Sequence, residues 1–137
     1  PLLEPLKARY HATANITFLG HVDHPEQYLR KTDYLVSASL SEGLPMAVLE
    51  GLSYGLPVLL SDIPSHLQLL NSGNFGRGFH VDDSRDFKVQ LEQLLRQKLD
   101  RAAFRKNAYE QYSDVVMTKR YAALYQKLLD DQKEVLG

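Results

Sequence analysis

The sequence contains no cysteine, which excludes disulfide bonds and metal sites built on thiolates. Basic and acidic residues nearly cancel, 16 against 17, so no global field favours a nucleic acid as partner. No apolar run approaches the roughly 18 residues that a membrane-spanning helix needs. The opening stretch PLLEPLKARY lacks the pattern of a signal peptide. We therefore expect a cytoplasmic protein, and the composition leaves attachment to a membrane surface open.

The chain also lacks internal repeats, low-complexity tracts and any stretch that resembles an interdomain linker. Its 137 residues are an ordinary length for one domain and are enough to bury a core. We therefore treat residues 1–137 as one unit, with a sheet-forming part over about residues 1–83 and helices over about residues 84–135.

Short apolar runs alternate with helix-patterned stretches in the first part of the chain. The runs predict strands for NITFLG at residues 15–20, YLVSAS at 34–39, PVLLSD at 57–62 and GRGFHV at 76–81. Helical patterns lie near residues 3–12, 25–31, 45–54 and 65–70. From Ser84 onward, the apolar spacing becomes wholly helical. Because apolar strands separated by helices are typical of a parallel sheet covered on both faces, the sequence predicts an open α/β sheet with a helical tail.

Two carboxylates stand out in the apolar segment LSEGLPMAVLEGLSYGLPVLLSD. Glu42 follows the hydroxyl-rich strand end SASLS, and Glu50 comes about a turn and a half into the helix that Pro45 begins. In open α/β sheets, ligands bind beyond the carboxyl ends of the strands, where helix amides favour an anion such as phosphate. Carboxylates accept hydrogen bonds from sugar hydroxyls. Together these groups fit a nucleotide-sugar, which carries both a diphosphate and hydroxyls.

The stretch SEGLPMAVLEGLSYGLPVLLSDIP resembles the donor-binding C-terminal domain of retaining GT-B glycosyltransferases of the group 1 class, with the E-x(7)-E motif at Glu42 and Glu50. NITFLGHV, TDYLVSAS and GRGFHV follow in the family's order, and MTKRYAALYQKLL resembles its terminal helix. The resemblance implies a Rossmann-like open parallel sheet, the C-terminal half of a GT-B fold. It also implies a hexosyltransferase-type enzyme of carbohydrate biosynthesis that moves a sugar from a nucleotide-diphospho-sugar to an acceptor with retention.

The resemblance further implies a role for individual residues. Glu42 would contact the transferred sugar near the reacting centre, and Glu50 would accept hydrogen bonds from the ribose hydroxyls. The other implied contacts are the backbone amides around Gly43, Leu44 and Met46 at the diphosphate or sugar, and His21 and Val22 at the base. No metal or other cofactor is expected, because protein cations and helix dipoles stabilise the leaving diphosphate in this class. Pro45 departs from many relatives, which have a glycine with an N–H at that position.

The family's first two strands of this domain, and the Arg and Lys that neutralise the diphosphate, have no counterpart before Asn15. We therefore expect a fragment that lacks these strands and the N-terminal acceptor domain, and that is inactive alone. In the family's strand order 3-2-1-4-5-6, the run at residues 15–20 would be the third strand and the run at 34–39 the fourth. Without the first and second strands, which lie between them, these two runs would be separated by a gap. Unpaired edges would then cause low stability or self-association, with the strands from Tyr34 to Val81 remaining one parallel sheet.

Several residues, and the function itself, allow other interpretations. The loop HVDHPEQ groups His21, Asp23 and His24, but without a distant further ligand these residues favour a polar turn and helix cap over a metal site. Gly76 and Gly78 could form a phosphate cradle, yet no helix follows directly and a turn into a strand is favoured. For function, a nucleotide-sugar epimerase and a non-catalytic nucleotide-binding or interaction module stay open.

Overall fold

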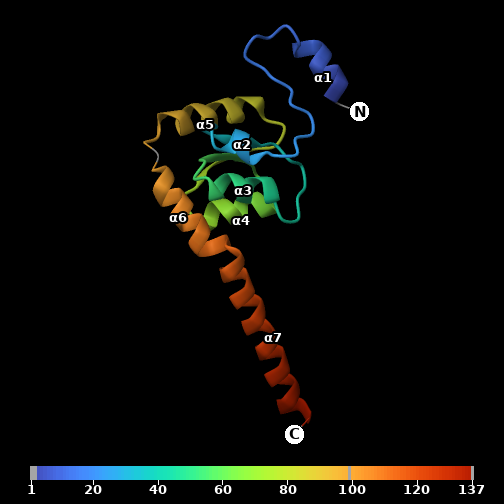
Figure 1. Ribbon diagram of the computed structural model, residues 1–137, viewed down its shortest axis with the longest axis vertical. Coiled ribbons are helices and arrows are strands. Elements are labelled where there is room, and N and C mark those ends of the chain that lie inside the picture. Colours follow the sequence, from blue (N-terminus) through green and yellow to red (C-terminus); the bar gives the residue numbers. More distant parts are fainter. Residues whose placement is uncertain (1–2, 99, 137) are drawn as a thin grey trace.

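The computed structural model describes residues 3–98 and 100–136, and Figure 1 shows how their helices and strands are arranged. The helices are α1 (Leu3–Tyr10), α2 (Glu26–Leu29), α3 (Met46–Ser53), α4 (Pro64–Ser72), α5 (Ser84–Arg96), α6 (Arg101–Tyr112) and α7 (Asp114–Leu136). The strands are β1 (Leu35–Ser37), β2 (Val58–Ser61) and β3 (Gly76–Phe79).

Within the described residues, the strands form one parallel sheet in the order β1-β2-β3. In its register Leu35 lies opposite Val58, and Val58 lies opposite Gly76. Helix α3 connects β1 to β2, and α4 connects β2 to β3. The predicted α/β fold, with one parallel sheet between Tyr34 and Val81, is confirmed. Because the strands are parallel, their carboxyl ends and the loops that follow them share one edge of the sheet.

The central strand β2 is buried on both faces, which explains its unbroken apolar run. Val58 and Leu60 belong to a core cluster with residues of α3, α4 and α6, whereas Leu59 packs with Phe79 and Leu94 in a second cluster. Figure 1 shows α5 on one side of the sheet and α3 and α4 on the other. The sheet is therefore the middle layer of a three-layer α/β arrangement.

The prediction of a strand at residues 15–20 is wrong. This run is not assigned to any strand, and the Ile16 N–H donates to the Thr13 carbonyl in a turn at 3.1 Å. Ile16 and Leu19 are 43% and 49% exposed. An apolar run gains sheet hydrogen bonds only beside another strand, and none pairs with it in the described part of the chain.

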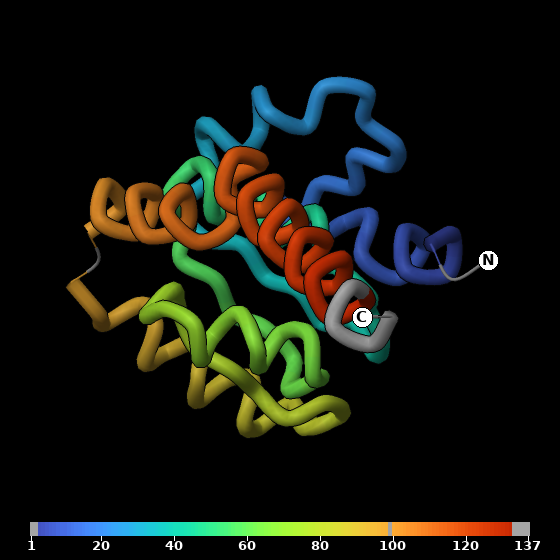
Figure 2. The backbone as a smooth tube through the Cα atoms, turned by 90° about the horizontal axis from the view of Figure 1, so that it is seen from below, coloured from blue at the N-terminus to red at the C-terminus, as the bar shows by residue number. Residues whose placement is uncertain are grey.

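The helical tail is confirmed, and its last helix leaves the body of the molecule. Helix α6 contributes Ala108 to the core, while α7 extends far from the sheet (Figure 1). Figure 2 looks up from the C-terminal end and shows the N-terminal segment as a separate arc at one side. Exposed apolar side chains along α7 include Tyr121, Leu124, Tyr125, Leu128 and Leu129. Among residues 3–98 and 100–136, no helix combines the length and apolarity needed to cross a membrane.

The unpaired side of β1 and the apolar residues of α7 both support the predicted self-association of the chain. Within the described residues, β1 pairs only with β2. Open strand edges and exposed apolar stripes are surfaces on which a second chain can pack. Self-association and low stability stay predictions.

Gly76 provides a test of the sheet, because it lies directly against the backbone of β2. A Cβ atom at Gly76 would stand 1.8 Å from the Val58 carbonyl oxygen. We expect Gly76→Ala to destabilise the chain by about 3 kcal/mol or more, since two paired backbones must separate. Urea unfolding measures the loss, and Gly78→Ala in the same strand is the control. A Cβ at Gly78 would stand 3.2 Å from the tip of the Leu70 side chain and 3.8 Å from the Leu60 carbonyl oxygen, so no backbone has to move. Equal losses for the two variants would contradict the register.

Candidate functional site

Glu42 lies on the loop between β1 and α3, at the carboxyl edge of the sheet, and serines at the end of β1 hold it. The Ser39 hydroxyl donates to Glu42 Oε1 at 2.6 Å. Because the single Ser39 proton is used in that bond, the Ser37 hydroxyl is the donor in its 3.3 Å contact with Ser39 Oγ. Glu42 is exposed, and its Oε2 has no hydrogen bond within the described residues. One carboxylate oxygen is thus fixed and the other is free to accept from a ligand.

Backbone amides near Glu42 are also free. The Met46 N–H is engaged, since it donates to the Leu44 carbonyl at 2.9 Å. No hydrogen bond of the described residues engages the amides of Gly43, Leu44 and Ala47. Unpaired amides at the start of a helix favour a negatively charged group. The loop therefore presents a free carboxylate oxygen and unpaired backbone amides within a few residues of one another.

The other predicted site residues lie on separate elements. Glu50 is exposed in α3, and its side chain makes no hydrogen bond or ion pair within the described residues. His21 and Val22 lie in the segment between α1 and α2. In the described chain, no hydrogen bond or ion pair connects these residues to the Glu42 loop. Their roles at the nucleotide stay predictions.

The structure also bears on the loop HVDHPEQ and on Gly76 and Gly78, for which the sequence allowed alternative interpretations. His21 Nε2 lies 3.5 Å from Asp23 Oδ1, and His24 Nδ1 lies 3.2 Å from Glu26 Oε1, which makes this loop a polar turn. The expected helix cap is wrong, because Pro25 occupies the N-cap position of α2 and no side chain caps it. Among the described residues, no group of His, Asp and Glu could hold a metal ion. Gly76 and Gly78 lie within β3, as the turn-into-strand interpretation predicted.

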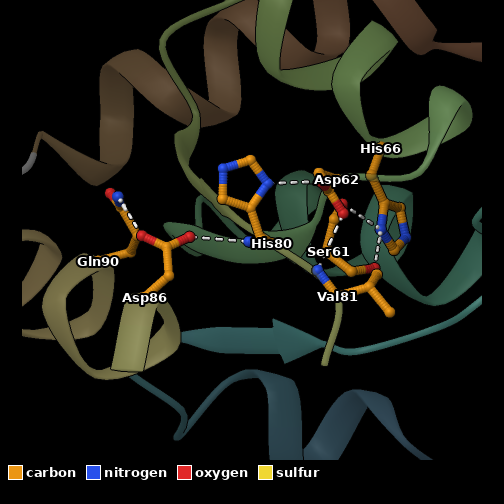
Figure 3. Close-up of polar contacts among 7 residues, drawn as sticks. All are labelled: Ser61, Asp62, His66, His80, Val81, Asp86 and Gln90. Atoms are coloured by element: carbon orange, nitrogen blue, oxygen red, sulfur yellow. Dashed lines mark hydrogen bonds and ion pairs between the residues drawn. The ribbon is translucent and has the colours of Figure 1, made fainter. Parts of the chain in front are cut away.

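Ser61 and His66 form a buried polar pair next to the Glu42 loop that sequence analysis missed. Ser61 ends β2, and its hydroxyl donates to the Ser39 carbonyl at 2.7 Å. The same hydroxyl oxygen lies 3.0 Å from His66 Nδ1 (Figure 3). Both residues are 0% exposed. The available signals were a polar residue ending an apolar strand and a histidine in the first turn of the next helix.

A second polar network joins the carboxyl ends of β2 and β3 (Figure 3). The Val81 N–H donates to Asp62 Oδ1 at 3.0 Å and lowers the pKa of Asp62, with a further contribution from His80. Asp62 Oδ2 lies 2.7 Å from His80 Nδ1 and raises the pKa of that ring above 6.5. A hydrogen bond from the Gln90 side chain lowers the pKa of Asp86, and a hydrogen bond from the His80 N–H lowers it further by a smaller amount. These contacts fix the loop between β3 and α5.

A concave surface of about 510 Å³ lies away from Glu42. It is lined by the C-terminal end of α3, by Tyr54 directly after it, and by α6 with Arg101 and Arg105. Because α3 runs antiparallel to the strands and leads into β2, its C-terminal end marks the opposite edge of the sheet. Ligands of open α/β sheets bind at the carboxyl edge, so we place the candidate site at Glu42 and not in this hollow.

The open parallel sheet, with free amides and a free carboxylate oxygen beyond its strand ends, defines an α/β domain of the kind whose ligands bind at the carboxyl edge. Residues 2–111 match the family described as Glycosyl transferases group 1. The chain belongs to this family.

Curated relatives include several bacterial glycosyltransferases. The chain is 29% identical to "Putative glycosyltransferase EpsD" of Bacillus subtilis, an alignment that covers 96% of this chain and 35% of the relative. It is 25% identical to N,N'-diacetylbacillosaminyl-diphospho-undecaprenol alpha-1,3-N-acetylgalactosaminyltransferase of Campylobacter jejuni, over 83% of this chain and 31% of the relative. It is 37% identical to the O-antigen biosynthesis glycosyltransferase WbnH of Escherichia coli, over 61% and 23%. The chain thus spans about a third or less of these relatives.

The ion pair between Asp62 and His80 predicts opposite pH effects at the two ends of the pH range. The raised pKa of His80 adds stability below pH 6.5 that is lost as the pH rises through that pKa. The lowered pKa values of Asp62 and Asp86 add stability above pH 3.8 that is lost as the pH falls through them. The folded chain should therefore gain most from this network at mildly acidic pH.

An NMR titration of the His80 ring checks this account. The midpoint should lie above 6.5 in the wild type and move down toward that value in Asp62→Asn, which removes the negative partner. Asp82→Asn is the control, because Asp82 makes no ion pair with His80 within the described residues. An unchanged midpoint in Asp62→Asn would contradict the assigned contact.

Proposed function

We propose that the chain is the donor-binding part of a retaining glycosyltransferase, which moves a hexose-type sugar from a nucleotide-diphospho-sugar to an acceptor. The observation that carries the proposal is the arrangement at Glu42, where Ser39 holds one carboxylate oxygen and the other is free beside unpaired amides. Family membership supports the same reaction class.

Each part of the loop has a chemical task in this reaction. The free oxygen of Glu42 accepts a hydrogen bond from the sugar and stabilises the positive charge that develops on it as the bond to the diphosphate breaks. The amides of Gly43, Leu44 and Ala47 face the negative charge of the diphosphate or sugar. The Met46 amide can join them only if its bond to Leu44 opens.

The nucleotide is held by residues outside the loop. Glu50 accepts hydrogen bonds from the ribose hydroxyls, and His21 and Val22 border the base. We propose no metal or other cofactor, since helix amides and protein cations neutralise the leaving diphosphate in this mechanism.

The acceptor is bound by protein outside this chain, in an N-terminal domain. The chain's short span of its relatives supports this division. The Campylobacter relative is named for a diphospho-undecaprenol compound, which is a lipid-linked sugar. We extend that chemistry to this protein as a proposal of cytoplasmic action at the membrane surface.

The motif assignment is tested in the full-length protein by release of nucleoside diphosphate from UDP-glucose, UDP-N-acetylglucosamine and GDP-mannose. Glu42→Gln should lower turnover about tenfold or more, because the amide still accepts from Ser39 but no longer carries the charge. Glu50→Gln should mainly weaken donor binding. Glu92→Gln, an exposed carboxylate change on α5, serves as the control.

The outcomes of this assay separate the functional alternatives. Wild-type kinetics in both Glu42→Gln and Glu50→Gln would show that the motif assignment is wrong. An epimerase of the alternative kind would convert the donor sugar without transferring it to an acceptor. Donor binding without turnover by the intact protein would indicate a non-catalytic module.

The isolated chain of residues 1–137 should not turn over any donor of the panel, because catalysis needs both substrates held in one geometry. The measurement is the same release assay on the purified chain. Repeated turnover would contradict the division of the site between this chain and an N-terminal domain.

A further inference from the structure

His66 is a fully buried polar residue that the proposed reaction does not use. It lies in the first turn of α4 and is 0% exposed. Its Nδ1 lies 3.0 Å from Ser61 Oγ and 3.2 Å from the Ser61 carbonyl oxygen. Its other ring nitrogen, Nε2, is buried without a hydrogen-bond partner in the described part of the chain. An unpaired buried nitrogen costs stability, so this histidine is not explained by packing alone.

The hydrogen bonds around Ser61 determine the direction of donation. The Ser39 carbonyl can only accept, so the single hydroxyl proton of Ser61 goes to it, at 2.7 Å. Ser61 Oγ and the Ser61 carbonyl are therefore both acceptors toward His66, and His66 Nδ1 carries a proton. The histidine thus orients the Ser61 hydroxyl toward the Ser39 carbonyl.

The same chain of hydrogen bonds reaches the candidate catalytic carboxylate. The Ser61 hydroxyl holds the backbone of Ser39, two residues beyond the end of β1. The Ser39 hydroxyl in turn donates to Glu42 Oε1 at 2.6 Å. Two sets of hydrogen bonds, joined by the covalent structure of Ser39, therefore connect the core helix α4 and the end of β2 to the loop that carries Glu42.

We propose that His66 is a positioning residue for Glu42, acting through Ser61 and Ser39 to hold that carboxylate at the transferred sugar. The proposal rests on the function proposed above. It explains why a buried position in α4 carries a histidine whose second nitrogen is unpaired, since an apolar side chain of similar size could not donate to Ser61. It also links the rigid core to a loop that otherwise carries few backbone hydrogen bonds.

The test measures donor hydrolysis by the full-length protein, with the donor of the panel that the wild type turns over fastest. His66→Phe keeps an aromatic ring, although a larger one, and removes the donor, so kcat should fall about tenfold or more while KM changes little. His66→Asn places an amide N–H near the position of Nδ1 and should restore most of kcat. Ser65→Ala is the matched control and should leave kcat unchanged. It removes another buried, unpaired polar atom from α4 but leaves the hydrogen bonds of Ser61 intact.

A double-mutant cycle separates positioning from a general structural effect. If His66 acts through Glu42, His66→Phe should cause no further loss of kcat in the Glu42→Gln background. Equal losses in both backgrounds, wild-type kcat in His66→Phe, or failure of His66→Asn to exceed His66→Phe would each overturn the proposal. If His66→Phe does not fold, Ser61→Ala replaces it, with the same loss expected and wild-type kcat overturning the proposal.

Failure of the proposed function is recognised separately in the same cycle. Glu42→Gln with wild-type turnover would overturn the function of Glu42 and, with it, the role of His66. Glu42→Gln with reduced turnover, combined with a normal His66→Phe enzyme, would overturn the role of His66 alone.

Discussion

The burial of β2 on both faces is the constraint on which the rest of the structure depends. Val58, Leu59 and Leu60 fill the two core clusters, and no side of this strand is left for solvent. Ser61 ends the strand at 0% exposure, so its hydroxyl must find partners inside the protein. It finds them in the Ser39 carbonyl and in His66, which ties the end of β1 and the start of α4 to the same point. The buried strand thereby fixes the edge at which a ligand would bind.

The chemistry of the site follows from this edge. Parallel strands bring their carboxyl ends together, and the loops beyond them carry the polar groups that a packed sheet cannot hold. Glu42 is exposed, but its carboxylate is held in place because the Ser39 hydroxyl donates to one of its oxygens. The ion pair between Asp62 and His80 similarly fastens the loop after β3 to the end of β2. The hollow beside Arg101 and Arg105 lies at the opposite edge, where Arg101 donates to the Thr32 carbonyl ahead of β1, and we assign it no part in the reaction.

The sequence was sufficient for the fold because each of the strands β1, β2 and β3 has an apolar run with a helical stretch beside it. It was misleading at residues 15–20, where the composition suits a strand but no neighbouring strand pairs with it in the described chain. It placed Glu42 on the correct loop from the SASLS strand end and from Pro45. It could not find the link between Ser61 and His66, because two residues that lie five positions apart give no sign that one hydroxyl also reaches Ser39. Nor could it show that the Met46 amide is already occupied.

The central claim is that the carboxyl edge around Glu42 binds the nucleotide-diphospho-sugar. The most direct measurement is a crystal structure of the full-length protein with a bound nucleotide-diphospho-sugar from the assayed panel. The account predicts the diphosphate within hydrogen-bonding distance of the amides between Gly43 and Ala47, the sugar at the free oxygen of Glu42, and the ribose at Glu50. A diphosphate bound at Arg101 and Arg105, on the opposite edge of the sheet, would contradict it.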